Sequence, residues 1–159
     1  MWRVAHAAPL VASGMQRVRR YSWTRRCDAA PEALWERFVE RCWIAGAGFG
    51  PKPSIDERGA PDGLGCTRSI ATLPGRRLKE RITATQYPER LEYRVLDPSW
   101  ATYPVEWHLG EVRFERLPDG ATEVIWTVEV VPLRGAGPLV AALTHWVVTR
   151  YLDALTASA

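Results

Sequence analysis

One stretch of the chain decides its fold: residues 105–131 read VEWHLGEVRFERLPDGATEVIWTVEVV. Apolar and polar residues alternate along Val105–Leu117 and again along Ala121–Val131, as they do in strands with one buried face. Between the two runs lies Pro118-Asp119-Gly120, which suits a three-residue hairpin loop with its glycine in the left-handed conformation. The stretch therefore predicts an antiparallel hairpin.

A symmetric turn also predicts which residues face one another across this hairpin. The predicted pairs are Phe114 with Val124, Val112 with Trp126, Gly110 with Val128, and His108 with Val130. Most of these residues are apolar and all lie on one side, so we expect that side to face the interior. By the same alternation, Glu106 and His108 share the inward face.

Further strands are expected on both sides of the hairpin in the sequence. Val18–Cys27 alternates and is predicted to be the first strand. Three more predicted strands, Cys66–Leu73, Leu78–Gln86 and Leu91–Leu96, are separated by turns that contain proline.

Two helices enclose this run of strands in the sequence. Pro31 suits the first turn of a helix that continues to about Cys42, because the amide that proline lacks would be unbonded there. An apolar stripe at helical spacing runs from Pro138 to about Thr156. This order of parts predicts an α+β fold: a curved antiparallel sheet wrapped around a long C-terminal helix, with an apolar cavity between them.

A glycine- and proline-rich segment, Ala45–Pro53, follows the first helix. Its Gly46-Ala47-Gly48-Phe49-Gly50 string superficially resembles a phosphate-binding loop, but no strand precedes it, and prolines follow where a helix should begin. We expect a mobile loop here, in the position of a lid at the mouth of a pocket.

The composition narrows the class of protein. With 159 residues, 47% of them hydrophobic and 25% charged, residues 17–159 are expected to form one globular domain. Three cysteines without a close pair and three scattered histidines indicate neither a disulfide framework nor a metal site.

Because no apolar run approaches the about 18 residues of a membrane span, no integral membrane association is expected, and the cytoplasm is the default compartment. Residues 1–16 are expected to be a disordered extension, unless Met15 is the true first residue.

Arginines and aromatic residues are interleaved between Arg17 and Arg26, a mixture that can bind nucleic acid. The period of two in this stretch instead assigns Arg20 and Arg26 to a solvent-facing side and Tyr21 and Trp23 to the inward side. We therefore expect no nucleic-acid partner. The eight tryptophans of the chain either fill the core or line a cavity with flat aromatic faces.

Five short motifs occur in an order that carries a family resemblance. They are APEALW at residues 30–35, GLGCTR at 63–68, LKERI at 78–82, LEYRV at 91–95 and DGATEVIW at 119–126. From about Arg20 to Leu155 the chain resembles the START-like, polyketide cyclase/dehydrase (SRPBCC, helix-grip) superfamily. It departs from the family after the first helix, where a tryptophan-rich pattern is common and this chain has only Cys42-Trp43 and the glycine-rich segment.

The resemblance implies a deep hydrophobic cavity between the sheet and the closing helix. Members of the superfamily bind lipids, sterols, hormones or polyketides, and some are aromatases or cyclases that need no cofactor. We therefore consider three functions: a binding protein for an apolar small molecule with one polar end, a cyclase/dehydrase-type lyase without cofactor, and a protein-interaction module with a collapsed cavity. Binding is the function that we expect, with the oligomeric state left open.

The candidate catalytic residues are Glu106 and His108, since a carboxylate and an imidazole in a partly dry cavity can have pKa values near neutrality. The alternative is that Glu106 lies in water and His108 makes one structural hydrogen bond. Arg25 could bind a ligand carboxylate or form a surface ion pair.

Arg68 and Glu80 lie on strands joined by the Pro74-Gly75 turn, which brings them close to one another. They are either a buried ion pair that anchors the sheet or a polar patch in the pocket, and we favour the first. The remaining candidate ligand-binding residues border the cavity if it is open and are core if it is filled: Trp23, Tyr93, Val112, Phe114 and Trp126.

Overall fold

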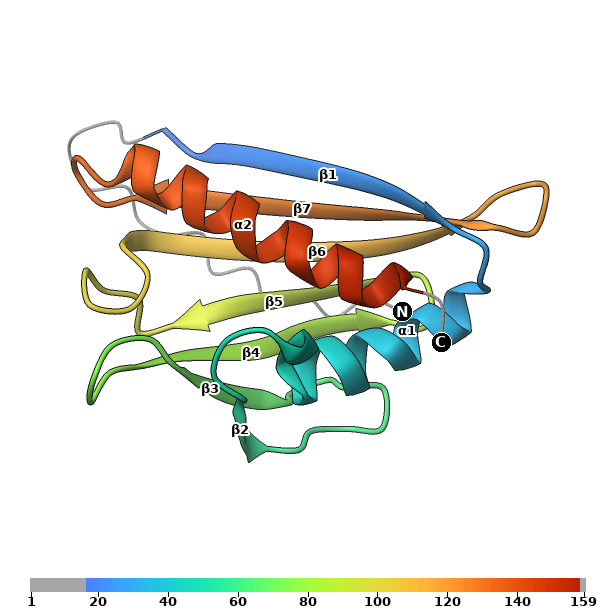
Figure 1. Ribbon diagram of the computed structural model, residues 1–159, viewed down its shortest axis with the longest axis horizontal. Helices are drawn as coiled ribbons and strands as arrows, with labels where there is room; N and C mark the ends of the chain where they lie inside the picture. Colours follow the sequence, from blue (N-terminus) through green and yellow to red (C-terminus); the bar gives the residue numbers. More distant parts are fainter. Residues whose placement is uncertain (1–16, 158–159) are drawn as a thin grey trace.

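The computed structural model describes residues 17–157 and shows a curved, fully antiparallel sheet with helices on one face (Figure 1). The sheet has seven strands in the order β1-β7-β6-β5-β4-β3-β2. The strands are β1 (Arg19–Cys27), β2 (Ser54–Glu57), β3 (Thr67–Ala71), β4 (Arg77–Gln86), β5 (Arg90–Leu96), β6 (Val105–Arg116) and β7 (Thr122–Pro132). The α-helices are α1 (Pro31–Arg37) and α2 (Gly137–Thr156), and residues 1–16, predicted to be an extension, lie outside the described part.

The β6–β7 hairpin forms as the alternation predicts. All four expected pairs occur: Phe114 with Val124, Val112 with Trp126, Gly110 with Val128, and His108 with Val130. Gly120 has a φ of 88°, so the turn uses the left-handed conformation that glycine adopts without strain.

The prediction that Glu106 shares the inward face with His108 is wrong. The register between β6 and β7 shifts between Val105 and Trp107, so that one extra residue is accommodated in β6. Val105 and His108 are both buried, whereas Glu106, inside the bulge, is exposed. A bulge changes the side on which the preceding residues fall, and strict alternation does not detect it.

α2 crosses the concave face of the sheet, and α1 lies on the same face (Figure 1). The inward face of α2 carries Val140, Thr144, Val148, Tyr151, Leu152 and Leu155, all of them buried. All of them except Thr144 pack with the inward side chains of the sheet and with Leu34 and Phe38 of the first helical segment in one hydrophobic core. Within residues 17–157, no helix combines the length and the apolar character needed to cross a membrane.

The first helix changes its winding after Arg37. Phe38–Ile44 forms π-helical turn η1, in which the Ala45 amide donates to the Glu40 carbonyl five residues earlier, at 3.0 Å. A short helical turn, η2 (Gly46–Gly48), follows it. The sequence predicted that the α-helix continues to about Cys42. Instead, the π-helical turn lies where this segment contacts Arg68 of the sheet, and π-helical turns are often found at functional sites.

Candidate functional site

The site is built around a charged pair inside the fold. Arg68 on β3 and Glu80 on β4 are directly paired across the sheet. The Arg68 Nε and Nη2 atoms lie 2.8 and 2.7 Å from Glu80 Oε2, and only 4% and 10% of the two side chains is exposed. Burial disfavours the charge of Arg68, but Glu80, together with Tyr151 and Tyr93, outweighs it, and the pKa of Arg68 stays above its ordinary value. The expected ion pair is therefore present and buried.

Arg68 also connects the sheet with the helical segment above it. Its Nη1 donates to the carbonyl oxygens of Cys42 and Trp43 at 2.9 and 2.8 Å, the carbonyls near the end of η1. Its guanidinium lies 4.0 Å from the Trp43 ring centroid and 5.4 Å from that of Tyr151 on α2. One side chain therefore contacts sheet, π-turn and closing helix.

Aromatic rings fill the space around this pair. Trp126 stacks on Tyr151 with centroids 5.7 Å apart, and Phe38 meets Trp126 edge-on at 5.5 Å. Trp43 meets Tyr93 edge-on at 5.4 Å. The interior between sheet and α2 is thus lined by large aromatic faces, and they occupy much of the room that an open cavity would need.

Tyr93 on β5 lies in the middle of this interior and takes the room that Gly110 leaves. A Cβ atom at Gly110 would overlap the Tyr93 ring, so the glycine makes room for the ring beside β6. The Tyr93 hydroxyl accepts a hydrogen bond from Trp126 Nε1 at 2.9 Å. Burial raises the pKa of Tyr93 well above its usual range, so the phenol stays protonated. Among residues 17–157 no side chain or carbonyl accepts the hydroxyl's own hydrogen.

His108 on β6 lies beside Tyr93, with ring centroids 5.3 Å apart. Its Nδ1 accepts a hydrogen bond from the Val95 amide at 3.3 Å, which leaves the proton on Nε2. Burial, with help from Arg94, lowers the pKa of His108 to about 3. The shift is away from neutrality, opposite to the one expected for an acid–base residue. At neutral pH His108 is an uncharged donor, and its Nε2 is not one of the fully buried atoms that lack a partner within residues 17–157.

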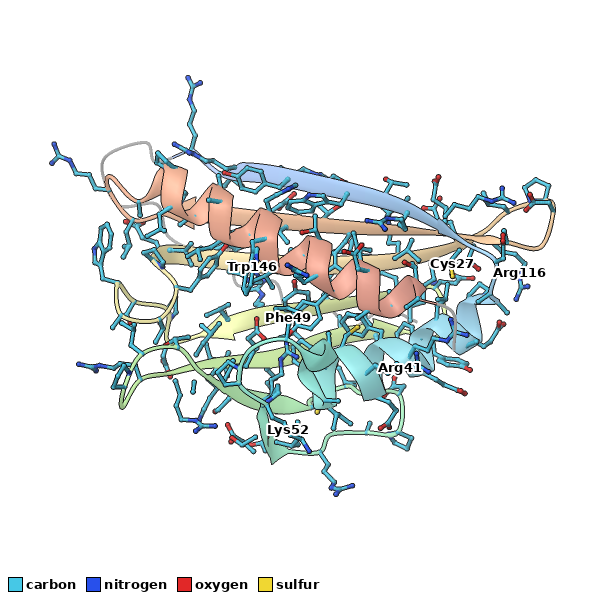
Figure 2. The ribbon with its side chains drawn as sticks, in the orientation of Figure 1. Cys27, Arg41, Phe49, Lys52, Arg116 and Trp146 are labelled. Atoms are coloured by element: carbon cyan, nitrogen blue, oxygen red, sulfur yellow. The ribbon has the colours of Figure 1, made fainter. Side chains whose placement is uncertain are left out.

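The glycine-rich segment covers this interior next to α2. Phe49 lies 5.0 Å from Tyr151 and 5.3 Å from Trp146, edge-on to both rings, and Figure 2 shows it between the loop and α2. Gly48 and Gly50 flank it with φ values of 74° and 70° and have no atoms close to where a side chain would be. The backbone on both sides of Phe49 therefore adopts a conformation that suits glycine.

The other predicted residues fall into two groups. Val112, Phe114 and Trp126 are buried, and Phe114 also borders a surface hollow of about 460 Å³ beside the start of α1. By contrast, Arg25 pairs with Asp153 of α2 at 3.0 Å in a largely exposed position, and Trp23 Nε1 donates to His145 Nδ1 at 3.1 Å. Arg25 and Trp23 thus connect β1 with the outer part of α2 and do not reach the Arg68–Glu80 pair.

Sequence reasoning missed three residues of the site: Trp43, Phe49 and Tyr151. Tyr151 was detectable in principle, because it lies four residues before Leu155 and three after Val148 on the buried stripe of α2. Trp43 and Phe49 had no such signal. Their positions depend on the π-helical winding of η1 and on the left-handed glycines that follow it.

Comparison with known proteins supports this architecture. No curated protein matches the sequence. Among solved structures, norcoclaurine synthase from Thalictrum flavum superposes with a TM-score of 0.72 at 12% identity, over 92% of this chain and 96% of that one. Ara h 8.0201 superposes with a TM-score of 0.66 at 14% identity, over 88% and 96% of the two chains.

A third similar structure is the di-domain ARO/CYC protein StfQ from the steffimycin biosynthetic pathway. Its TM-score is 0.68 at 11% identity, and the match covers 87% of this chain but 49% of StfQ. At such identities the three structures establish a shared fold. A family model described as polyketide cyclase/dehydrase and lipid transport matches residues 21–159. The chain therefore belongs to the family described as polyketide cyclase/dehydrase and lipid transport.

Proposed function

We propose that this protein binds an apolar, flat small molecule that carries one oxygen acceptor, such as a ketone or a hydroxyl group. The observation that carries the proposal is the Tyr93 O–H, a neutral donor to which the described residues offer no acceptor, in an aromatic interior beside the neutral ring of His108. A buried donor without an acceptor costs about 1–3 kcal/mol, and a ligand oxygen that accepts the hydrogen of the Tyr93 hydroxyl would recover that free energy.

The rings around this donor favour an apolar and preferably aromatic ligand. Trp43, Trp126 and Tyr151 offer faces and edges on which such a molecule can stack. Because these rings are packed against one another, the ligand needs room that Phe49 now occupies beside Tyr151. Access through the glycine-flanked segment is therefore part of the proposal, in keeping with its expected role as a lid.

Binding without turnover is the function that we propose. An imidazole with a pKa of about 3 is a poor general base at neutral pH, and Glu80 is held by Arg68. Glu106, the second catalytic candidate, is exposed in the bulge of β6, on the other side of the strand from His108. The family, whose description includes lipid transport, and the Tyr93 donor both agree with a carrier or sensor of a small molecule.

The test compares two ligands of nearly equal shape, 2-acetylnaphthalene and 2-ethylnaphthalene, by tryptophan fluorescence titration. We expect the ketone to bind more tightly, by roughly tenfold, since one hydrogen bond contributes about 0.5–1.5 kcal/mol. Tyr93→Phe should remove most of this preference while the ethyl compound keeps its affinity. Tyr87→Phe, at an exposed tyrosine, is the matched control. Equal affinities for the two compounds in the unmodified protein, or no binding of either, would contradict the proposal.

A further inference from the structure

The two ends of the sheet differ in chemistry. Because the strands are antiparallel, the connections β3–β4 (72–76), β5–β6 (97–104) and β7–α2 (133–136) lie at one end with the start of β1, on the left of Figure 1. We call this the basic end. The connections β1–α1 (28–30), β2–β3 (58–66), β4–β5 (87–89) and β6–β7 (117–121) lie at the opposite, acidic end.

The three connections of the basic end form one continuous surface. Thr72 Oγ1 donates to the Ala101 carbonyl at 3.4 Å, which joins the first connection to the second. The Leu133 amide donates to the Pro104 carbonyl at 2.9 Å, which joins the second to the third. Residues from separate parts of the sequence are thereby held in a fixed relation.

Large apolar side chains are exposed on this surface. Trp100 is 61% exposed, Leu73 56% and Leu139, in the first turn of α2, 50%. Each of the three lies on one of the elements that meet at the basic end, and exposed apolar residues that occur together mark interaction sites.

The charges around these residues have one dominant sign. The basic end carries exposed Arg76 and Arg134 in its connections and exposed Arg17 just before β1, and its connections carry one exposed carboxylate, Asp97. Within residues 17–157, neither Arg76 nor Arg134 forms an ion pair with a carboxylate. At the acidic end the connections carry Asp28, Asp62, Glu89 and Asp119 against one arginine, Arg58.

We infer that the basic end docks onto an anionic lipid bilayer. Tryptophan and leucine side chains enter the interfacial region of a bilayer, where tryptophan is favoured. Arginines beside them are attracted to lipid phosphates. A hollow of about 370 Å³ between Pro51 and the β3–β4 turn, with Leu73, Arg76 and Arg77 in its wall, offers room for a headgroup. The charge complementarity selects an anionic surface, and the inference does not depend on the ligand proposed above.

The test is co-sedimentation of the full chain with phosphatidylcholine vesicles, either pure or containing phosphatidylglycerol at roughly a third of the lipid. We expect binding to the anionic vesicles, little binding to the neutral ones, and release in high salt. Arg76→Ala with Arg134→Ala should weaken binding about thirtyfold, or about fivefold for each arginine near the surface. Trp100→Ser should weaken it about tenfold, the effect of losing one buried aromatic side chain.

Two matched controls separate docking from general adsorption. Arg41→Ala with Arg58→Ala removes the same charge from exposed positions outside the basic end, and Leu64→Ser matches Leu73→Ser. Both controls should bind like the unmodified protein, whereas Leu73→Ser should bind less. Control variants that lose as much affinity, Trp100→Ser that binds normally, or no binding to anionic vesicles would each overturn the inference. A dimer in light scattering that Trp100→Ser converts to a monomer would do so too, since the patch would then be a protein interface.

Discussion

Two arginine–carboxylate pairs connect helices with the sheet, and they stand in opposite environments. Arg68 and Glu80 lie beneath the helices with 4% and 10% of their side chains exposed, whereas Arg25 and Asp153 lie at the edge with 43% and 58% exposed. The inner pair also contacts η1 and stacks near Trp43, and the outer pair joins only β1 and α2. The same chemistry therefore has a structural role in one place and a minor one in the other.

The difference arises from the cost of removing charge from water. An exposed pair gains little, because water and salt screen both charges. A buried pair has lost its hydration, so each partner depends on the other and on further hydrogen bonds. Glu80 and the carbonyls of Cys42 and Trp43 supply these for Arg68.

The largest effect is expected from breaking the inner pair on one side only. Arg68→Met leaves Glu80 charged and unpaired in the interior and removes the donor from two carbonyls, so the free energy of unfolding should fall by about 3–5 kcal/mol. Chemical denaturation measures it. The double variant Arg68→Met with Glu80→Leu should recover part of the loss but not all, because the carbonyls of Cys42 and Trp43 still lack their donor. Full recovery would mean that the link to η1 contributes nothing.

The second-largest effect on stability is expected from His108, which is buried as a neutral imidazole. Its pKa is lowered from 6.5 to about 3 on folding, so below pH 6.5 the unfolded chain takes up a proton that the folded chain does not. Stability from this residue is therefore complete above pH 6.5 and falls by about 1.4 kcal/mol for each pH unit between 6.5 and 3.

His108→Gln isolates this contribution, because glutamine keeps a side-chain acceptor for the Val95 amide and does not titrate. Denaturation curves from pH 7 to 4 should show that the unmodified protein loses stability relative to His108→Gln by about 1.4 kcal/mol for each pH unit below 6.5. If the free energies of unfolding of the two proteins changed with pH in the same way, the burial of a neutral imidazole at His108 would be contradicted.

A third prediction concerns packing beside the inner pair. Gly110→Ala places a methyl group where the Tyr93 ring lies, which forces the ring and its bond with Trp126 to shift. Overpacking of this kind costs about 1–3 kcal/mol, and the shift should also weaken ketone binding. Thermal unfolding and the naphthalene titrations measure both. Gly135→Ala, with a positive φ but open space around it, serves as the control for the loss of a glycine, since it changes stability without changing ligand affinity.

The same two environments explain what could be predicted from the sequence. Alternation and one turn were sufficient to predict all four β6–β7 pairs, because the register of a strand with one buried face is fixed by its apolar residues. The contact of Arg68 with Glu80 followed from a short turn between neighbouring strands. The bulge at Glu106, the π-winding of Phe38–Ile44 and the place of Phe49 depend on backbone geometry that no periodic pattern records. The fold was therefore more predictable than the site.

The smallest effect is expected at the outer pair. Arg25→Gln removes an ion pair whose partners are both largely exposed, so the free energy of unfolding should change by less than about 1 kcal/mol. The change should shrink further in 1 M salt, where exposed charges are screened within about 3 Å. Denaturation at low and high salt, with the Arg68→Met variant measured alongside, tests both pairs under one protocol. A loss at Arg25 as large as that at Arg68 would show that the contact of α2 with β1, rather than the buried pair, holds the closing helix on the sheet.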